Sequence, residues 1–300
     1  MLIIGSRGSK LALWQAHWVA ARLGELGEPT RIEIIRTTGD KITDVALSQV
    51  GGKGLFTKEI EEALLDGRID LAVHSLKDLP TELPPGLALA AIPPREEPRD
   101  AIVGSTLESL VHGAKVGTSS LRRASQLRLA RPDLVVESVR GNVDTRLRKL
   151  DDGVYAAIVL AGAGLRRLGW DDRIAELLPF ETMCPAVGQG ALAIETRDEG
   201  AALDVCSRLN DPCTQAAVTA ERAVLAALGG GCQVPIGAHA VVEHEMMHIR
   251  SVVLSPDGKQ VVRKEAEGLR ADAEIIGGEL GAALLQEGAQ EILEEVYGAG

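Results

Sequence analysis

Aromatic residues are scarce in this chain, which holds three Trp, two Tyr and two Phe among 300 residues. Proteins that bind single-stranded nucleic acid stack its bases on aromatic side chains beside a basic groove. The formal net charge of −11 also disfavours contact with a phosphate backbone. We therefore expect no nucleic-acid partner, although a local basic site remains possible.

Long apolar runs and clustered cysteines are missing too. Charged residues or glycines interrupt each apolar run well before the roughly 18–20 residues that a membrane helix needs. The four cysteines, Cys184, Cys206, Cys213 and Cys232, form no C-x-x-C pair. The segment Met1–Arg7 is typical of a strand start and not of a secretory signal. These features predict a cytoplasmic protein with no membrane partner and no disulfide framework.

Apolar, β-branched segments alternate with helix-period segments through the first two thirds of the chain, which predicts α/β layers with parallel or mixed sheets. We expect strands at Leu2–Gly5, Arg31–Arg36, Asp70–His74, Leu87–Ile92, Ala101–Val103, Ala114–Val116, Leu134–Val139, Ala156–Leu160 and Leu192–Ile194. We expect helices at Lys10–Leu23, Lys58–Leu65, Ser120–Ala130 and Val143–Leu150.

Two stretches break this alternation, the Pro-rich segment Pro93–Asp100 and the segment Glu181–Gly190. Beyond Asp211 the pattern changes to an Ala-rich helix, a triple glycine, three strand-like segments and a final acidic helix, which predicts a small α+β domain. These expected elements are the helix Gln215–Leu228 and the strands Ala238–Val242, Ile249–Leu254 and Gln260–Glu265.

Basic residues are concentrated between Lys115 and Lys149, a window that holds nine basic residues and three acidic ones. Within this window, Gly117–Arg123 brings hydroxyls and two arginines to the point where a strand becomes a helix. The unpaired N–H groups and dipole of a helix start favour anions, and arginine offers paired donors to carboxylate or phosphate. A simple helix cap at Ser119 and solvated arginines are the alternative reading.

The same arrangement recurs twice, at Arg140–Arg146 and at Arg7 with Ser9, each after an expected strand. Taken together, the three copies favour an anion site and make a ligand with several carboxylates plausible, with phosphate still open.

Two further segments admit a chemical and a structural reading. Lys77 and Asp78 follow the expected strand Asp70–His74, where a carboxylate could move a proton or stabilise a cation, or could form a surface pair with the lysine. Cys232 lies in the glycine-rich run Gly229–Pro235, where a thiolate could attach a ligand covalently or the thiol could simply pack.

The segment His244–His248 matches the H-E-x-x-H pattern of zinc peptidases, which requires a helix. Its neighbours favour a strand or hairpin, where the two imidazoles would lie too far apart in a straight strand to chelate one metal ion. We therefore predict a hairpin and no metal site.

Together these segments make the chain resemble the porphobilinogen deaminase (hydroxymethylbilane synthase) family. The resemblance covers nearly the whole chain, and its most specific parts are Val-His-Ser-Leu-Lys-Asp and Gly-Gly-Cys-Gln-Val-Pro. The matching segments are Leu11–Ala16, Val50–Phe56, Ala72–Asp78, Gly117–Arg123, Arg140–Asn142, Pro185–Gly190 and Gly231–Gly237. The match is weaker at Arg7–Lys10 and in the acidic C-terminal stretch.

The resemblance implies an enzyme of tetrapyrrole biosynthesis that joins four porphobilinogen units head to tail into hydroxymethylbilane, releasing ammonia. It implies a dipyrromethane cofactor on a thioether to Cys232, with Asp78 as the catalytic residue. It also implies binding residues for the cofactor at Lys77, Asp78, Ser120, Arg122, Arg123 and Arg146, and for the substrate at Arg7, Ser9, Arg140, Arg146 and Gln189, with Lys53 and Phe56 on a mobile loop.

For the fold, the resemblance implies two α/β domains like those of periplasmic binding proteins plus a small α+β C-terminal domain. We expect domain 1 at residues 1–94 and 190–211, domain 2 at 98–184 and domain 3 at 212–300, in a monomer. A non-catalytic anion-binding module of the same architecture is the main alternative, and it would need neither Cys232 nor Asp78.

Overall fold

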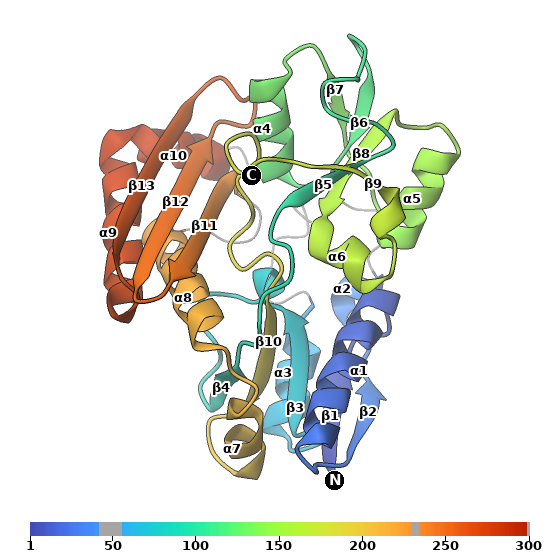
Figure 1. Ribbon diagram of the computed structural model, residues 1–300, viewed down its shortest axis with the longest axis vertical. Coiled ribbons are helices and arrows are strands. Elements are labelled where there is room, and N and C mark those ends of the chain that lie inside the picture. Colours follow the sequence, from blue (N-terminus) through green and yellow to red (C-terminus); the bar gives the residue numbers. More distant parts are fainter. Residues whose placement is uncertain (42–55, 230–233, 299–300) are drawn as a thin grey trace. The chain divides into compact units, whose positions relative to one another are not determined.

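Residues 1–41, 56–229 and 234–298 are described by a computed structural model of the chain, which divides into two compact units (Figure 1). Unit 1 comprises Met1–Glu96 and Ala191–Gln215, and unit 2 comprises Glu97–Gly190 and Ala216–Gly300. The first passage between units falls inside the predicted break at Pro93–Asp100, and the second falls at the end of Glu181–Gly190.

The sheet of unit 1 has the strand order β2-β1-β3-β10-β4. Its first three strands run parallel, with Ile4 opposite Ile32 and Leu71, whereas β10 runs antiparallel to both β3 and β4. Its strands are β1 (Leu2–Ser6), β2 (Thr30–Ile34), β3 (Leu71–Ser75), β4 (Leu87–Ala91) and β10 (Leu192–Arg197).

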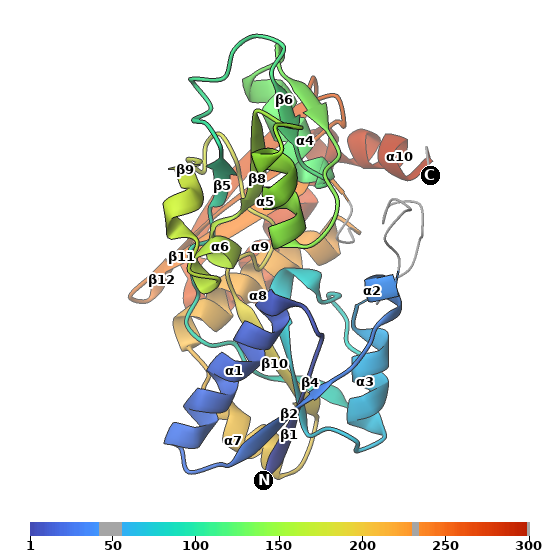
Figure 2. The same ribbon diagram turned by 90° about the vertical axis from the view of Figure 1, so that its right-hand side faces the viewer.

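Helices cover both faces of this sheet, with α1 and α3 on opposite sides (Figure 2). The apolar spacing of α1 buries Ala16, Val19 and Leu23, and that of α3 buries Ile60 and Leu64. The helices are α1 (Lys10–Glu25), α2 (Thr38–Lys41), α3 (Lys58–Leu65) and α7 (Ala201–Ser207), with a 3-10 turn, η1, at Leu76–Asp78.

Unit 2 contains a second α/β sheet with the order β7-β6-β8-β5-β9, in which β5 is the antiparallel strand. The two sheets thus share one topology. In each, the antiparallel strand is the first strand that follows a crossing of the chain from the other unit: β5 in unit 2 and β10 in unit 1. The strands are β5 (Asp100–Val103), β6 (Lys115–Gly117), β7 (Val135–Glu137), β8 (Ala157–Ala161) and β9 (Ile174–Leu177).

Strand β9 is the one strand of these two sheets that the sequence analysis missed. Its four residues lie directly after a 3-10 turn at Asp171–Arg173 and occupy an edge of the sheet, where too few residues alternate to give a pattern. Helix α4 packs on one face through Leu127, and two further helices pack on the other face through Leu147 and Leu165. The helices are α4 (Leu121–Ala130), α5 (Val143–Asp151) and α6 (Gly162–Arg167).

The C-terminal part forms a three-stranded antiparallel meander, β11-β12-β13, covered by helices over a core of its own. The final acidic helix predicted from the sequence is preceded by a separate helix, because Gly288 adopts a φ of 104° and ends the helical path between them. The elements are α8 (Pro212–Ala227), β11 (Ile236–Glu243), β12 (Met246–Leu254), β13 (Val261–Leu269), α9 (Ala273–Leu284) and α10 (Gln290–Gly298).

The predicted fold class is confirmed as two α/β sheets and a small antiparallel sheet with helices. The three-domain division stays a prediction, since unit 2 combines one α/β sheet with the C-terminal sheet. The predicted hairpin is also confirmed: β11 ends at Glu243, β12 begins at Met246, and His244 lies in the turn with a φ of 57°. No cluster of His, Cys, Asp or Glu suited to a metal ion occurs in the part of the chain described.

Candidate functional site

In unit 1, the predicted site residues follow two neighbouring strands. Arg7 and Ser9 come directly after β1, and Lys77 and Asp78 form η1 directly after β3. Because β1 and β3 are parallel neighbours, these segments leave the sheet at the same edge. The Asp78 side chain is exposed, while Ser9 caps α1 by accepting a hydrogen bond from the Ala12 N–H at 3.3 Å.

Arg7 also contacts a residue of the predicted loop. Its guanidinium carbon lies 4.1 Å from the centroid of the Phe56 ring, within the range of a cation–π contact. This contact brings Phe56 to the sheet edge where Arg7 leaves β1. Lys53, the other residue predicted on this loop, lies outside the described residues.

In unit 2 the predicted site residues again follow two neighbouring parallel strands, β6, which leads to the start of α4, and β7. Ser120 caps α4, since its hydroxyl accepts a hydrogen bond from the Arg123 N–H at 3.4 Å. The cap is therefore Ser120, whereas Ser119 donates its hydroxyl to the Val139 carbonyl. Arg140 follows β7, the parallel neighbour of β6, so it leaves the sheet at the same edge as α4 begins.

Arg122 and Arg123 both bind a buried carboxylate, Asp100. Arg122 donates from Nη1 to Asp100 Oδ2 at 2.7 Å, and Arg123 donates from Nε to Oδ1 at 2.8 Å. Asp100 is fully buried, and the two arginines are 4% and 6% exposed. Although burial alone would raise the pKa of the Asp100 carboxyl, the two guanidinium groups hold it well below its usual range.

Gln189 belongs to the same network. Its side-chain amide donates to the Pro98 carbonyl at 2.8 Å and to Asp100 Oδ1 at 3.0 Å, and its oxygen accepts from Arg123 Nη2 at 3.4 Å. Gln189 is 0% exposed. It therefore ties the segment before β5 to the arginines at the start of α4.

Asp100 is the residue of this network that sequence reasoning missed. The only local signal was an acidic residue at the start of a strand that is buried throughout. An unpaired buried carboxylate is costly, so such a position calls for a cationic partner. The sequence could not tell which of the many arginines supplies it.

Arg146 differs from the other arginines in its surroundings. Its Nε donates to the Gly141 carbonyl at 2.8 Å, within the turn that begins α5. Burial, together with the positive charge of Arg123, lowers the pKa of Arg146 to about 10. Arg146 stays cationic at neutral pH, and an anion placed between it and Arg123 would relieve their repulsion.

Of the four cysteines, Cys184 and Cys206 are buried and Cys213 is partly exposed. Burial raises the pKa of both Cys184 and Cys206 to about 12, so neither forms a thiolate at neutral pH. Cys206 is fully buried in the core under α1. Cys232 lies outside the described residues.

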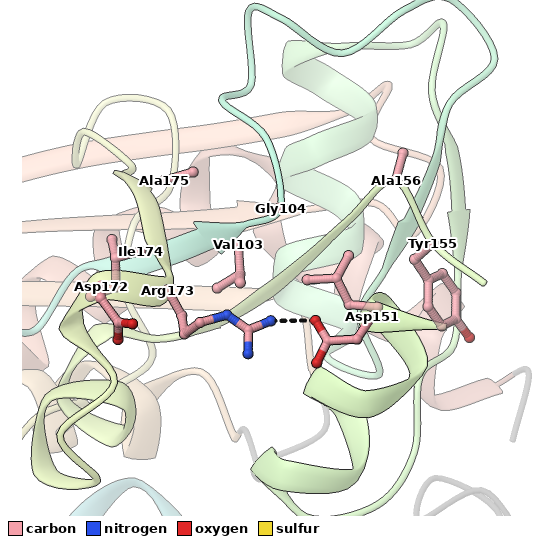
Figure 3. A pocket seen from close by; sticks show the side chains of 10 residues that line it. Val103, Gly104, Asp151, Tyr155, Ala156, Asp172, Arg173, Ile174 and Ala175 are labelled. Atoms are coloured by element: carbon pink, nitrogen blue, oxygen red, sulfur yellow. Dashed lines mark hydrogen bonds and ion pairs between the residues drawn. The ribbon is translucent and has the colours of Figure 1, made fainter. Parts of the chain in front are cut away.

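A cavity of about 460 Å³ in unit 2 lies away from these residues (Figure 3). Its walls come from the end of β5 at Val103 and from β9, and Asp151 and Asp172 make it acidic. Arg173 crosses it to bind Asp151 at 2.6 Å. The predicted anion-binding residues do not line this cavity, and its acidic lining does not suit a polycarboxylate.

Comparison with known proteins identifies the family. The model for the porphobilinogen deaminase dipyromethane cofactor binding domain matches residues 2–204, and that for the porphobilinogen deaminase C-terminal domain matches residues 215–286. The chain belongs to the porphobilinogen deaminase family.

Porphobilinogen deaminases similar to this chain come from diverse bacteria. That of Syntrophobacter fumaroxidans is 51% identical over 99% of this chain and 98% of its own, and that of Nitratidesulfovibrio vulgaris strain DP4 is 52% identical over 100% and 98%. A periplasmic substrate-binding protein of an ABC transporter from Coxiella burnetii aligns with 74% of this chain and 97% of its own, at 13% identity and a TM-score of 0.44. At that score we draw no argument from the likeness.

Membership of the porphobilinogen deaminase family decides between the two readings left open by the sequence, in favour of the enzyme over the non-catalytic module. The donor set also fits the dipyrromethane cofactor of the family. A ligand with several carboxylates requires several cationic and hydroxyl donors. Unit 2 supplies Ser120 and Arg123 at the start of α4, and Arg146 at the start of α5. No helix in the described part of the chain is long and apolar enough to cross a membrane.

Proposed function

We propose that in this porphobilinogen deaminase Asp78 is the catalytic carboxylate and that two groups of basic and hydroxyl side chains bind the carboxylates of cofactor and substrate. The reaction is the head-to-tail joining of four porphobilinogen units into hydroxymethylbilane, with release of ammonia. One observation carries the assignment: in each α/β sheet, the chosen side chains follow the carboxyl ends of neighbouring parallel strands.

The chemistry asks for a carboxylate at a fixed and accessible place. Departure of the amino group from porphobilinogen leaves positive charge on the pyrrole, which a nearby carboxylate stabilises. Asp78 meets this need because it is exposed and ends a turn held by the Leu79 N–H to Leu76 carbonyl bond of 3.1 Å. Lys77, beside it in the same turn, is the proposed cationic partner for a cofactor carboxylate.

The chemistry also asks for many cationic donors, since each added pyrrole brings an acetate and a propionate. Arg7, Ser9 and Arg140 are proposed to bind the substrate or growing chain, with Arg146 serving both cofactor and substrate. Gln189 is proposed to act through Arg123, which it contacts. When bound through Cys232, the dipyrromethane supplies the end to which new units are joined.

Arg122 and Arg123 are proposed to hold cofactor carboxylates from a position fixed by Asp100. Arg122 uses both Nη1 hydrogens within the protein, on Asp100 and on the Cys184 carbonyl at 2.6 Å, and one Nη2 hydrogen on Asp100. No other described residue takes its Nε or second Nη2 hydrogen, and these two are proposed to bind a ligand carboxylate. Asp100 thus orients the Arg122 guanidinium, and its negative charge offsets the positive charge that the buried arginines bring into unit 2.

We further infer that the protein works as a monomer in the cytoplasm. Within the described residues, the buried cysteines Cys184 and Cys206 form no disulfide, which supports a reducing compartment.

The experiment that tests the proposal is turnover of porphobilinogen by the purified protein. We expect one ammonia for each porphobilinogen consumed and one linear tetrapyrrole for every four. Porphobilinogen binding without ammonia release would contradict the assignment and favour the anion-binding alternative.

A further inference from the structure

Three ionisable side chains meet inside unit 1, below the turn that carries Asp78. His74 on β3 lies with its Nε2 2.9 Å from Oε2 of Glu195 on β10, and Glu61 on α3 faces both. His74 is 7% exposed, Glu195 0% and Glu61 8%. The proposed reaction uses none of these three groups directly.

The alternation along the strands explains why the three side chains meet. Leu71 and Val73 of β3 and Ile194 of β10 point into the core under α1, and Ala72 points into the core under α3. His74 and Glu195 therefore share the face of the sheet that α3 covers. The ion pair joins the two strands diagonally, since His74 is opposite Ala193 and Glu195 is opposite Ala72.

The joined strands also hold the turn η1. Ser75 pairs with Leu192, and the next residue, Leu76, donates its N–H to the Ala191 carbonyl at 3.0 Å. Asp78 follows two residues later. The register of β10 against β3 thus determines where Asp78 stands, and the His74–Glu195 contact is a side-chain bond across that register.

The cluster holds more carboxylate than its one histidine can balance. Burial raises the pKa of Glu61, and the nearby Glu195 raises it further, against lowering by the neighbouring Thr57 hydroxyl and by His74. Among the described residues, Oε1 of Glu61 and Oε1 of Glu195 have no hydrogen-bond partner. His74 and Glu195 are the two members of the cluster that a hydrogen bond joins.

We propose that His74 and Glu195 are positioning residues of the reaction, which hold the turn Leu76–Asp78 in place by fixing β3 against β10. The proposal rests on the role proposed for Asp78. It assigns a reaction-specific purpose to a buried polar contact whose two groups both lose contact with water on folding, a loss that their pairing offsets only in part.

The same two strands offer a matched control at their other end. Arg197 is the last residue of β10, and its Nη2 donates to Oδ1 of Asp70, the residue before β3, at 3.3 Å. Its Nη1 donates to the Leu64 and Ile69 carbonyls at 2.7 and 2.9 Å. This pair fixes β10 at the end of β3 opposite to Asp78. A variant there disturbs the same sheet without touching the turn.

The test compares Glu195→Gln with Arg197→Gln in porphobilinogen turnover, at a temperature where circular dichroism shows both fully folded. We expect kcat of Glu195→Gln to fall roughly 10- to 100-fold, because small misplacements of a catalytic group are that costly. KM and the mass that the cofactor adds to the polypeptide should stay unchanged. Arg197→Gln should lower the melting temperature and leave kcat unchanged.

Two results would overturn the proposal: an equal loss of kcat in both variants, or an unchanged kcat in Glu195→Gln. If Glu195→Gln does not fold, His74→Gln replaces it, since its amide can still donate to Glu195 and should lower kcat less than His74→Ala does. Turnover of porphobilinogen by the parent protein and by Asp78→Asn is measured in the same experiment. An inactive parent or an active Asp78→Asn would contradict the proposed function, whereas failure of Glu195→Gln alone would remove only this inference.

Discussion

The Arg122 guanidinium donates to Asp100 Oδ2 at 2.7 Å in a place where neither side chain is more than 4% exposed. Arg123 shares the same carboxylate, so a single aspartate holds two neighbouring arginines at the start of α4. Because the three groups are buried together, their geometry is set before any ligand arrives. Binding of a polycarboxylate at the start of α4 therefore costs little conformational entropy, because the two arginine side chains are already ordered.

Replacing Asp100 should reveal this dependence. Asp100→Asn leaves two buried guanidinium groups without their counter-ion, and we expect a loss of about 3–5 kcal/mol in the free energy of unfolding at neutral pH. Because the folded-state pKa of Asp100 is lowered, its contribution is present above the unfolded pKa and disappears as the pH falls. Urea unfolding at neutral and acidic pH measures both effects.

The control for this variant is Asp133→Asn, which breaks the surface pair with Arg131 in the same unit. Surface pairs contribute little, so its urea midpoint at neutral pH should stay close to that of the parent. Equal midpoints for Asp100→Asn and the parent would show that the buried network does not stabilise the fold.

Asp78→Asn should keep the fold and nearly abolish turnover. The substitution removes the negative charge that we propose stabilises the cationic pyrrole, but it keeps the size of the side chain. We expect a fall in kcat of at least about 100-fold, the scale of losing one electrostatic group at a reacting centre. Glu82→Gln removes an equal charge from an exposed position nearby and should leave kcat unchanged.

Arg140→Leu should weaken substrate capture without preventing attachment of the cofactor. Losing a charge-assisted hydrogen bond costs about 1.5–3 kcal/mol, so KM for porphobilinogen should rise at least about tenfold. Arg148→Leu removes the same charge from an exposed position on α5 and should change KM little. Loss of the cofactor mass from Arg140→Leu would show that Arg140 serves the cofactor instead.

Glu61→Gln should reduce the pH dependence of stability. With the pKa of Glu61 raised in the folded protein, its proton favours folding at low pH, and this advantage is lost as the pH rises from the unfolded pKa through the folded one. The glutamine stays uncharged throughout, so the melting temperature of the variant should fall less than that of the parent as the pH rises from about 4.5. An equal change of melting temperature with pH in the variant and the parent would contradict a raised pKa of Glu61 in the folded protein.

Local patterns predicted most of the elements because their causes are local. The helix at Lys58–Leu65 has its predicted ends, and the strands containing Ile4, Val73 and Ile158 are observed with ends shifted by at most one residue. Strand-end positions of Arg7, Asp78 and Arg140 were predictable for the same reason, since a strand followed by a polar turn can be read from the sequence.

The buried partners could not be predicted in this way. Asp100 and Arg122 lie 22 residues apart, and His74 and Glu195 lie 121 apart. Their pairing depends on which strands become neighbours, and β10 reaches β3 only after the chain has passed through unit 2 and returned. The sequence held the charges, but the sheet order decided which of them meet.

The mass of the intact protein tests whether this chain carries a covalently attached dipyrromethane on Cys232. We expect a mass above that of the bare polypeptide by two pyrrole units, with the excess confined to the peptide that contains Cys232 and absent from Cys232→Ser. A parent protein that turns over porphobilinogen at the mass of the bare chain would contradict it.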